Sequence, residues 1–246
     1  MSAHVPRILI VDDEADTCAN LADIFADFGY RVDVAYDGEA ALPLVEHNSY
    51  DVALLDLRMP GMNGIDLYQH IKRVSSGTVA IVVTAHATRD SVQSALDAGA
   101  WSIVSKPVDI PNLVGLVSEA VNSPLILIVD DDKSLCVNLR EILRDRGYRV
   151  HLAHDAGEAE KALRSQEFQL VVVDAKLPGE KDVSVFQVIQ ETHRQAPTLV
   201  LTEEEQDMEP RVQQALSAGA QAICYKPFDV PALLSTIGKL VKAQHA

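Results

Sequence analysis

Cysteine is scarce in this chain, and long apolar runs are missing. The 246 residues include Cys18, Cys136 and Cys224, an odd number without C-x-x-C spacing. This argues against a disulfide framework and against a zinc site, and it is typical of a protein in a reducing compartment. No apolar run approaches the roughly 18 residues of a membrane span, and residues 1–16 turn acidic too early for a signal peptide. We therefore expect a cytoplasmic protein with no membrane partner.

Basic residues are also few. The chain carries 21 Lys and Arg against 36 Asp and Glu, which gives a formal net charge of −15 at pH 7. No basic patch or arm stands out in either half, whereas attraction to phosphates dominates nucleic-acid binding. The composition therefore predicts no direct nucleic-acid partner. The length suits two globular domains.

The sequence repeats itself at an offset of 118 residues. The stretch "RILIVDDEADTCANL" at 7–21 aligns with "LILIVDDDKSLCVNL" at 125–139, and Asp56 aligns with Asp174. After a two-residue insertion, "ALDAGAWSIVSKPVDIPNL" aligns with "ALSAGAQAICYKPFDVPAL". The repeat has the length of a whole domain. We therefore predict two domains, residues 1–122 and 123–246.

Each half alternates apolar runs with helical spacing. The runs in the first half are 7–11, 31–35, 52–55, 79–83 and 102–104. Apolar residues at helical spacing lie between them: Leu21, Ile24, Phe25 and Phe28; Ile65, Leu67, Tyr68 and Ile71; Val92 and Leu96; Leu113, Leu116 and Val117. Short runs that are apolar on both faces suit parallel strands, so five such units predict an open, doubly wound sheet. Pro43 should kink or shorten the second helix.

Polar side chains follow the predicted strands at the points where they end. In the first half these are Asp12, Asp13 and Glu14, then Asp56, then Thr84 and Ala85, and finally Lys106 with Pro107. The carboxyl ends of parallel strands share one edge of the sheet, which is where ligands bind. Clustered carboxylates repel one another unless a cation joins them, and hard oxygen ligands in an open cluster favour Mg²⁺.

The same residue types suit a phosphoryl group. A carboxylate can attack phosphorus to form an acyl phosphate. A metal ion and a lysine neutralise charge on the phosphoryl oxygens, and a hydroxyl can bond to one of them. The chain has neither G-x-G-x-x-G after its first strand nor a G-x-x-x-x-G-K-[ST] loop, so a nucleotide site is not expected.

Both halves resemble the receiver domains of response regulators in two-component signalling. The resemblance rests on the acidic pair, the later Asp, the threonine and the Lys-Pro pair, in order and at the family's spacings. It covers nearly the whole chain, twice. It implies an α/β protein of two tandem flavodoxin-like (βα)5 domains with doubly wound parallel sheets. It further implies a phosphorylation-dependent switch, which is not an enzyme beyond its own phosphorylation and dephosphorylation.

The resemblance assigns roles to individual residues. It implies that Asp56 accepts the phosphoryl group, that Lys106 pairs with the phosphoryl oxygens, and that Thr84 moves toward them. The matching residues of the second half are Asp174, Lys226 and Thr202. The implied Mg²⁺ ligands of the first half are the carboxylates of Asp12, Asp13 and Asp56 and the backbone carbonyl of Arg58. Those of the second half are Asp130, Asp131, Asp174 and Lys176.

The second half departs from the pattern. Glu203 replaces Ala85, and Glu204, Glu205, Gln206 and Asp207 follow it. A carboxylate there opposes a dianion, mimics its charge, or pairs with Lys226. The glycine-bearing "GMNG" of the first half becomes "GEKD", so we expect the second domain to be less readily phosphorylated, or silent, with its metal binding intact.

Both halves also lack the aromatic residue that receivers usually carry three positions before the lysine. Ile103 and Ile223 stand there instead. We therefore expect the link from the threonine to the output face to differ from the family's usual aromatic switch. Asp37 and Asp155 are interpreted as helix N-caps outside the site, and the histidines as surface or packing residues.

The expected partners are a histidine kinase or a histidine phosphotransfer protein as phosphoryl donor, and a downstream protein target. A homodimer is also plausible for a receiver. Two alternatives stay open at this point. One is an adaptor built from pseudo-receivers, for which Glu203 is the main argument. The other is a Mg²⁺-dependent phosphohydrolase of the haloacid-dehalogenase type, although Asp12 and Asp13 are adjacent rather than in a D-x-D arrangement.

Overall fold

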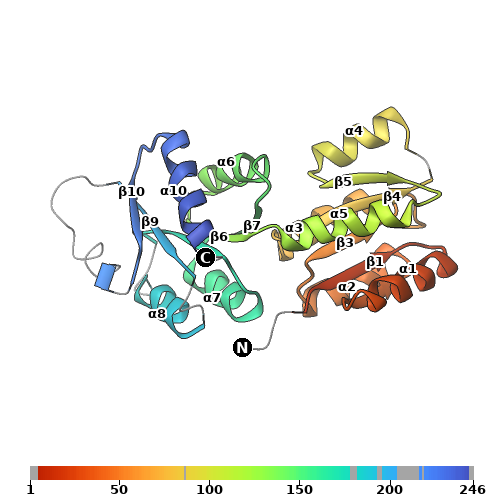
Figure 1. The fold of residues 1–246 in the computed structure, drawn as a ribbon, viewed down its shortest axis with the longest axis horizontal. Coiled ribbons are helices and arrows are strands. Elements are labelled where there is room, and N and C mark those ends of the chain that lie inside the picture. Colours follow the sequence, from red (N-terminus) through yellow and green to blue (C-terminus); the bar gives the residue numbers. More distant parts are fainter. Residues whose placement is uncertain are drawn as a thin grey trace. The chain divides into compact units, whose positions relative to one another are not determined.

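The apolar runs of the two halves form two separate five-stranded parallel sheets (Figure 1). The computed structural model describes residues 5–85, 87–177, 182–192, 196–203, 216–217 and 219–243, with the backbone alone for 182–184. The chain divides into two compact units, the first ending at Ser123 and the second beginning at Pro124. Within the described ranges, no helix is long and apolar enough to cross a membrane.

The first unit alternates strands and helices throughout. Its strands are β1 (Arg7–Val11), β2 (Arg31–Ala35), β3 (Val52–Leu55), β4 (Val79–Thr84) and β5 (Ser102–Ser105). Its helices are α1 (Ala15–Asp27), α2 (Gly38–His47), α3 (Gly64–Val74), α4 (Arg89–Asp97) and α5 (Ile110–Asn122). The strand order is β2-β1-β3-β4-β5. The order reverses between β1 and β3, and ligands bind at such a switch point in α/β sheets.

The second unit repeats this arrangement. Its strands are β6 (Leu125–Val129), β7 (Arg149–Ala153), β8 (Leu170–Asp174), β9 (Thr198–Thr202) and β10 (Ala222–Tyr225). Its helices are α6 (Lys133–Arg144), α7 (Ala156–Ser165), α8 (Asp182–Thr192) and α10 (Val230–Ala243). The strand order β10-β9-β8-β6-β7 matches that of the first unit read from the other edge. The predicted fold, two doubly wound flavodoxin-like domains in tandem, is confirmed.

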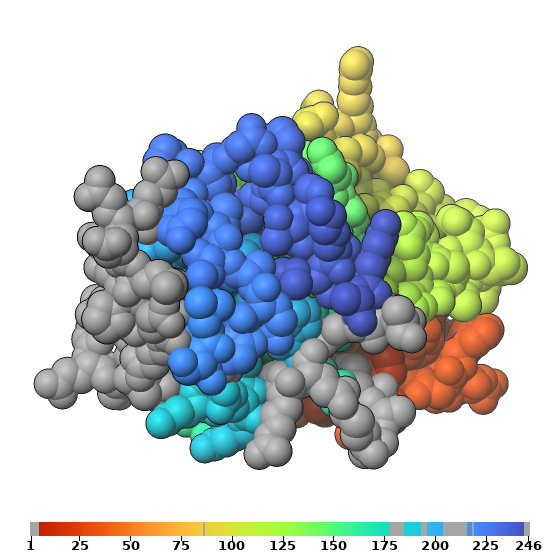
Figure 2. All heavy atoms as spheres, turned by 60° about the vertical axis from the view of Figure 1, so that its left-hand side comes forward, coloured from red at the N-terminus to blue at the C-terminus, as the bar shows by residue number. Residues whose placement is uncertain are grey.

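The central strands are apolar on both sides because helices cover both faces of each sheet. On β1, Ile8 and Ile10 pack with α1 and α5, whereas Leu9 and Val11 pack with α2 and α3. In the second unit, α10 buries Leu233, Ile237 and Val241 and leaves its other face at the surface (Figure 2). This alternation explains why the strands read as unbroken apolar runs.

The helix ends follow from local side-chain chemistry. Asp37 accepts a hydrogen bond from the backbone N–H of Ala40, and Asp155 accepts one from the N–H of Glu158. Both aspartates are therefore N-caps, as predicted. Gly29 follows α1 with φ +85°, a conformation in which only glycine is unstrained.

Three details of the helices do not follow from the helical spacing alone. Pro43 does not shorten α2, which has 10 residues like the proline-free α7. Ala41 and Val45 are buried on either side of it and hold the helix on the sheet. Phe28 and Leu96, which share helical spacing with core residues, are 61% and 47% exposed, because Phe28 lies beyond the last turn of α1 and α4 buries Ala95 instead.

One histidine lies in the core of the second unit. His151 on β7 is buried and meets the ring of Phe168 edge-on, with ring centroids 5.9 Å apart. Its Nδ1 lies 3.4 Å from Nε2 of Gln166. Burial, and secondarily the charge of Arg149, lowers the pKa of His151 to about 4. His151 is therefore a neutral packing residue, as the sequence predicted for the histidines as a class.

We expect the stability of the second unit to depend on pH through His151. Between its ordinary pKa of 6.5 and its folded pKa of about 4, the unfolded chain binds a proton that the folded chain does not. The free energy of unfolding should therefore fall as the pH is lowered through this window, by on the order of 3 kcal/mol for this group. Calorimetry of the full chain at several pH values measures this, and His151→Leu should weaken the dependence. A His151 titration midpoint near its ordinary value by NMR would contradict the prediction.

Candidate functional site

Three carboxylates meet at the carboxyl edge of each sheet. Asp12 and Asp13 follow β1, and Asp56 follows β3, the strand paired with β1. One carboxylate oxygen from each of the three lies within 4.8 Å of the other two. Asp130, Asp131 and Asp174 form the same cluster in the second unit. In each cluster the first and last acids are buried and the middle one is exposed.

A lysine neutralises part of this charge in the first unit. Lys106 follows β5, and its Nζ lies 2.7 Å from Oδ2 of Asp12 and 3.2 Å from Oδ2 of Asp56. It also lies 3.2 Å from Oε2 of Glu14, a contact that the sequence did not predict. The backbone N–H of Lys106 donates to the carbonyl of Thr84, which fixes the lysine to the end of β4. In this cluster, one ammonium group therefore faces three carboxylates that follow the strand ends.

The pKa values at this edge result from two opposing effects, burial and the charge of neighbouring groups. Burial raises the pKa of Asp12, and the hydrogen bond from Lys106 offsets this only in part. Burial by itself would lower the pKa of Lys106, but the hydrogen bond and charge of Asp12, with the charge of Asp56, outweigh it and raise that pKa. Lys106 is therefore a permanent cation at neutral pH, and the acids beside it still carry an uncompensated negative charge.

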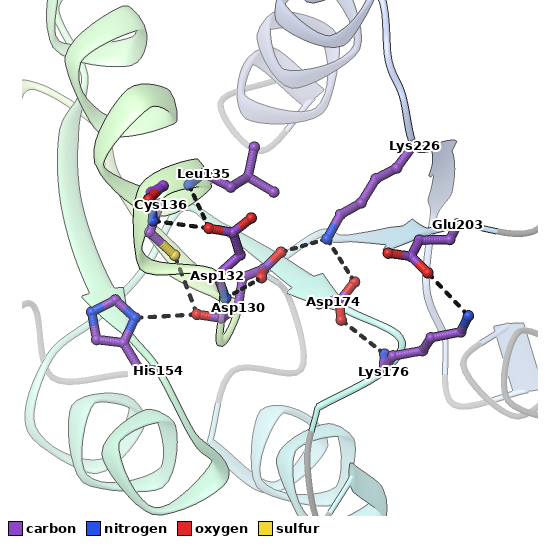
Figure 3. Close-up of polar contacts among 10 residues, drawn as sticks. Asp130, Asp132, Leu135, Cys136, His154, Asp174, Lys176, Glu203 and Lys226 are labelled. Atoms are coloured by element: carbon purple, nitrogen blue, oxygen red, sulfur yellow. Dashed lines mark hydrogen bonds and ion pairs between the residues drawn. The ribbon is translucent and has the colours of Figure 1, made fainter.

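The second unit has the same lysine with fewer partners (Figure 3). The Nζ of Lys226 lies 2.7 Å from Oδ2 of Asp130 and 3.0 Å from Oδ1 of Asp174. Asp132 occupies the position of Glu14, but its Oδ1 accepts from the N–H groups at the start of α6 and does not contact the lysine. Burial raises the pKa of Asp130, as it does for Asp12.

The backbone orients both acceptor candidates. The N–H of Arg58 donates to Oδ1 of Asp56 at 3.2 Å, and the N–H of Lys176 donates to Oδ2 of Asp174 at 3.0 Å. In each case the other carboxylate oxygen contacts the lysine. Each carboxylate is therefore held in one orientation, with both oxygens already engaged.

The two threonines are buried at the ends of β4 and β9. Thr84 is fully buried, and Thr202 is nearly so. The Oγ1 of Thr202 has no hydrogen-bond partner among the described residues. A buried hydroxyl without a partner costs about 1–3 kcal/mol, so such a group is normally explained by a role or a missing partner.

A buried thiol supports the acidic loop in each unit. The Sγ of Cys18 lies 3.3 Å from the carbonyl oxygen of Asp12, and the Sγ of Cys136 lies 3.3 Å from that of Asp130. Burial raises the pKa of Cys18 to about 11 and that of Cys136 to about 12, so both remain thiols that can donate. In the second unit His154 Nδ1 also contacts this carbonyl, at 3.1 Å (Figure 3). The aligned cysteines were the only sequence signal for this contact.

A glycine lets α3 begin against the acceptor. A Cβ added to Gly64 would lie 2.1 Å from the carbonyl oxygen of Asp56, which no side chain can tolerate. The N–H of Gly64 donates to the carbonyl of Leu57 at 3.3 Å. Asp182 occupies the aligned position at the start of α8. The close approach of α3 to the backbone of Asp56 therefore depends on the absence of a side chain at position 64.

Glu203 of the second unit pairs with Lys176 rather than with Lys226. Oε2 of Glu203 lies 3.2 Å from Nζ of Lys176, whereas Lys226 contacts the two aspartates (Figure 3). Of the three roles considered for Glu203, pairing with Lys226 is not observed, because that lysine contacts the buried Asp130 and Asp174 instead. Glu204, Glu205, Gln206 and Asp207, and the loop residues "GEK", lie outside the described residues.

The comparisons with known proteins agree for both halves. Residues 8–118 and 126–238 each match the family model for the response regulator receiver domain. A response regulator receiver protein of Anaeromyxobacter sp. (strain Fw109-5) is 34% identical over 234 residues, which cover 95% of this chain and 94% of that protein. The transcriptional regulatory protein ZraR of Klebsiella oxytoca is 35% identical over 121 residues, which span 49% of this chain and only 27% of that regulator.

Two solved structures each match about half of this chain. A response regulator receiver domain protein (CheY-like) from Methanospirillum hungatei JF-1 is 29% identical, with a TM-score of 0.47, over 48% of this chain and 95% of that chain. Response regulator TrrA of Thermotoga maritima, solved in complex with Mg(2+)-BeF, is 31% identical, with a TM-score of 0.44, over 47% of this chain and 99% of that chain.

Replacement of Gly64 by alanine should destabilise the first unit. The added Cβ would clash with the backbone of Asp56, and overpacking of this kind costs about 1–3 kcal/mol. The fluorescence of Trp101, the chain's single tryptophan, follows denaturation of this unit. The control is Gly115→Ala on α5, where the added Cβ meets nothing within 4 Å and should stabilise the helix by about 0.5–1 kcal/mol. Equal stability of Gly64→Ala and wild type would contradict the close approach.

Proposed function

The chain belongs to the response regulator receiver family, and from this premise we propose that it is a signalling switch phosphorylated on Asp56. The proposed donor is a histidine kinase or a histidine phosphotransfer protein, and the output is contact with another protein. The observation that carries the proposal is the buried Asp56 carboxylate, held by Lys106 on one oxygen and by the N–H of Arg58 on the other.

The residues of the first unit suit transfer of a phosphoryl group. An oxygen of Asp56 forms a bond to phosphorus while the bond from phosphorus to the donor's imidazole nitrogen breaks, and the electron pair stays on that nitrogen. Lys106 remains a cation beside the acceptor and stabilises the negative oxygens of the transferred group. Thr84 is the proposed hydroxyl partner of one of those oxygens.

The acidic cluster fits a divalent cation. Three carboxylates lie within reach of one ion, and one ammonium does not balance their charge. In the first unit Asp12, Asp13, Asp56 and the carbonyl of Arg58 would hold Mg²⁺; in the second unit the ligands would be Asp130, Asp131, Asp174 and the carbonyl of Lys176. When bound, Mg²⁺ supplies positive charge that stabilises the phosphoryl oxygens.

For the second unit we propose slower phosphorylation of Asp174. The Oγ1 of Thr202, which has no partner among the residues that the structure describes, and the contact of Asp174 with Lys226 support acceptance of a phosphoryl group. The carboxylate of Glu203, held at 3.2 Å from Lys176 on the loop after the acceptor, opposes it by like-charge repulsion. If Asp174 accepts no phosphoryl group at all, the second unit acts as an adaptor, which is the second candidate function for this half.

Incubation with acetyl phosphate and Mg²⁺ should add one phosphoryl group rapidly to wild type, as measured by intact-protein mass. Asp56→Asn should abolish the rapid addition, and Asp174→Asn should leave it unchanged. Asp37→Asn is the matched control, because Asp37 caps α2 and asparagine also caps helices. No added mass in wild type, or rapid addition that survives Asp56→Asn, would rule out the proposal.

Replacement of Glu203 by alanine should accelerate the labelling of Asp174 by up to about fivefold, since an exposed charge near the acceptor is worth roughly 1 kcal/mol. Alanine is the residue at the aligned position 85. The rate is read by mass against time in an Asp56→Asn background, which isolates the second site. The reciprocal change, Ala85→Glu, should slow labelling of Asp56. The same rate with and without Glu203 would mean that this carboxylate does not limit the second site.

A further inference from the structure

Two side chains of α3 hold the carboxyl end of α4 in the first unit. Oη of Tyr68 donates to the carbonyl of Gly99 at 3.0 Å, and Nζ of Lys72 donates to the carbonyl of Ala98 at 2.9 Å. Lys72 also stands over the Tyr68 ring, 5.6 Å from its centroid. Carbonyls at the end of a helix have no partner within the helix and carry its negative dipole, which favours a cation there. We name Tyr68 and Lys72 the α3 clamp.

The other end of α3 rests on the acceptor loop. Gly64, the first residue of the helix, lies against the carbonyl of Asp56 so closely that it excludes any side chain. The 11-residue helix therefore has one end at the proposed phosphorylation site and, one to two turns later, the clamp on α4. A group added to Asp56 that displaces the loop would also displace α3, because a helix moves largely as a rigid body.

The residue after the acceptor packs beneath α4. Leu57 belongs to a small buried cluster that joins the loop after β3 to α3, β4, α4, β5 and the loop between α4 and β5: Leu57, Val82, Ala95 and Ala100, with Ile65 and Ile103 packed against them. Ile103 fills the β5 position of this cluster and has no polar group with which to respond to a change at the site. The apolar packing supplies contact between these elements, and the α3 clamp supplies the directional bonds.

We propose that Tyr68 and Lys72 are positioning residues that couple the α4–β5 segment to the acceptor loop. This inference rests on the proposed phosphorylation of Asp56. When Asp56 is phosphorylated, the clamp transmits the displacement of α3 to residues 96–101 and changes the surface that a partner meets. Without the clamp, Asp56 still accepts the phosphoryl group, but the α4–β5 segment no longer changes when Asp56 is phosphorylated.

The second unit supplies matched replacements for both clamp residues. Phe186 aligns with Tyr68 and lacks the hydroxyl, and Gln190 aligns with Lys72 and lacks the charge. The test variant is therefore the double substitution Tyr68→Phe with Lys72→Gln in the full chain. The control is Tyr50→Phe, which also has a phenylalanine at the aligned position, Phe168. It removes the hydrogen bond of another buried tyrosine, from Tyr50 to Asp33, at the opposite end of the strands.

Hydrogen–deuterium exchange of the segment that ends α4 is the measurement. The N–H groups of Ala98, Gly99, Ala100 and Trp101 are all hydrogen-bonded in the backbone, so their exchange reports local opening. Each protein is measured before and after treatment with acetyl phosphate and Mg²⁺, with the mass of the same sample recorded. In the double variant we expect exchange about tenfold faster before treatment, since the hydrogen bond of Tyr68 and the positive charge of Lys72 are lost, and no further change on phosphorylation. Tyr50→Phe should behave as wild type does in this segment.

The outcomes separate the two proposals. A mass increase in all three proteins, with a change of exchange on phosphorylation in wild type and Tyr50→Phe alone, supports the α3 clamp. A mass increase with the same exchange response in the double variant as in wild type overturns the clamp and leaves the proposed function intact. No mass increase in wild type overturns both.

Discussion

The repulsion among three carboxylates at one sheet edge is the constraint on which the rest of each unit depends. Burial already raises the pKa of Asp12 and Asp130, so these acids are held close at a cost in free energy. One lysine per unit offsets part of that cost by direct contact with two of the acids. The charge that remains unbalanced makes the edge receptive to a cation, and the lysine makes it receptive to an anion.

The two copies keep this constraint but differ in several of the contacts around it. In the first unit Glu14 adds a third partner for the lysine, and Gly64 admits α3 to the acceptor. In the second unit Asp132 is the N-cap of α6, and Glu203 pairs with Lys176 on the loop after the acceptor. Duplication has therefore preserved the buried charges and altered the exposed charges and the loop. A difference in the rate of phosphorylation, rather than in its chemistry, is the expected result.

Much of the fold was predictable, because apolar runs and their terminal polar residues depend on local sequence. The strand-end position of Asp56, Thr84 and Lys106 follows from such runs. The partner of Glu203 was not predictable, since it depends on which cation the buried acids had already attracted. The exposure of Phe28 and the α3 clamp were missed for a related reason. Both depend on how neighbouring elements meet in space, which helical spacing does not report.

The contact between Gly64 and the backbone of Asp56 has a consequence for how the two copies change over time. Any side chain at position 64 is excluded, so no single substitution at that position preserves the first acceptor loop. The second copy carries Asp182 at the aligned position of its sequence. Mutational tolerance should therefore be unequal after the duplication. The first acceptor loop should accept no substitution of this glycine without a change of its backbone, whereas its counterpart already has a side chain at the aligned position.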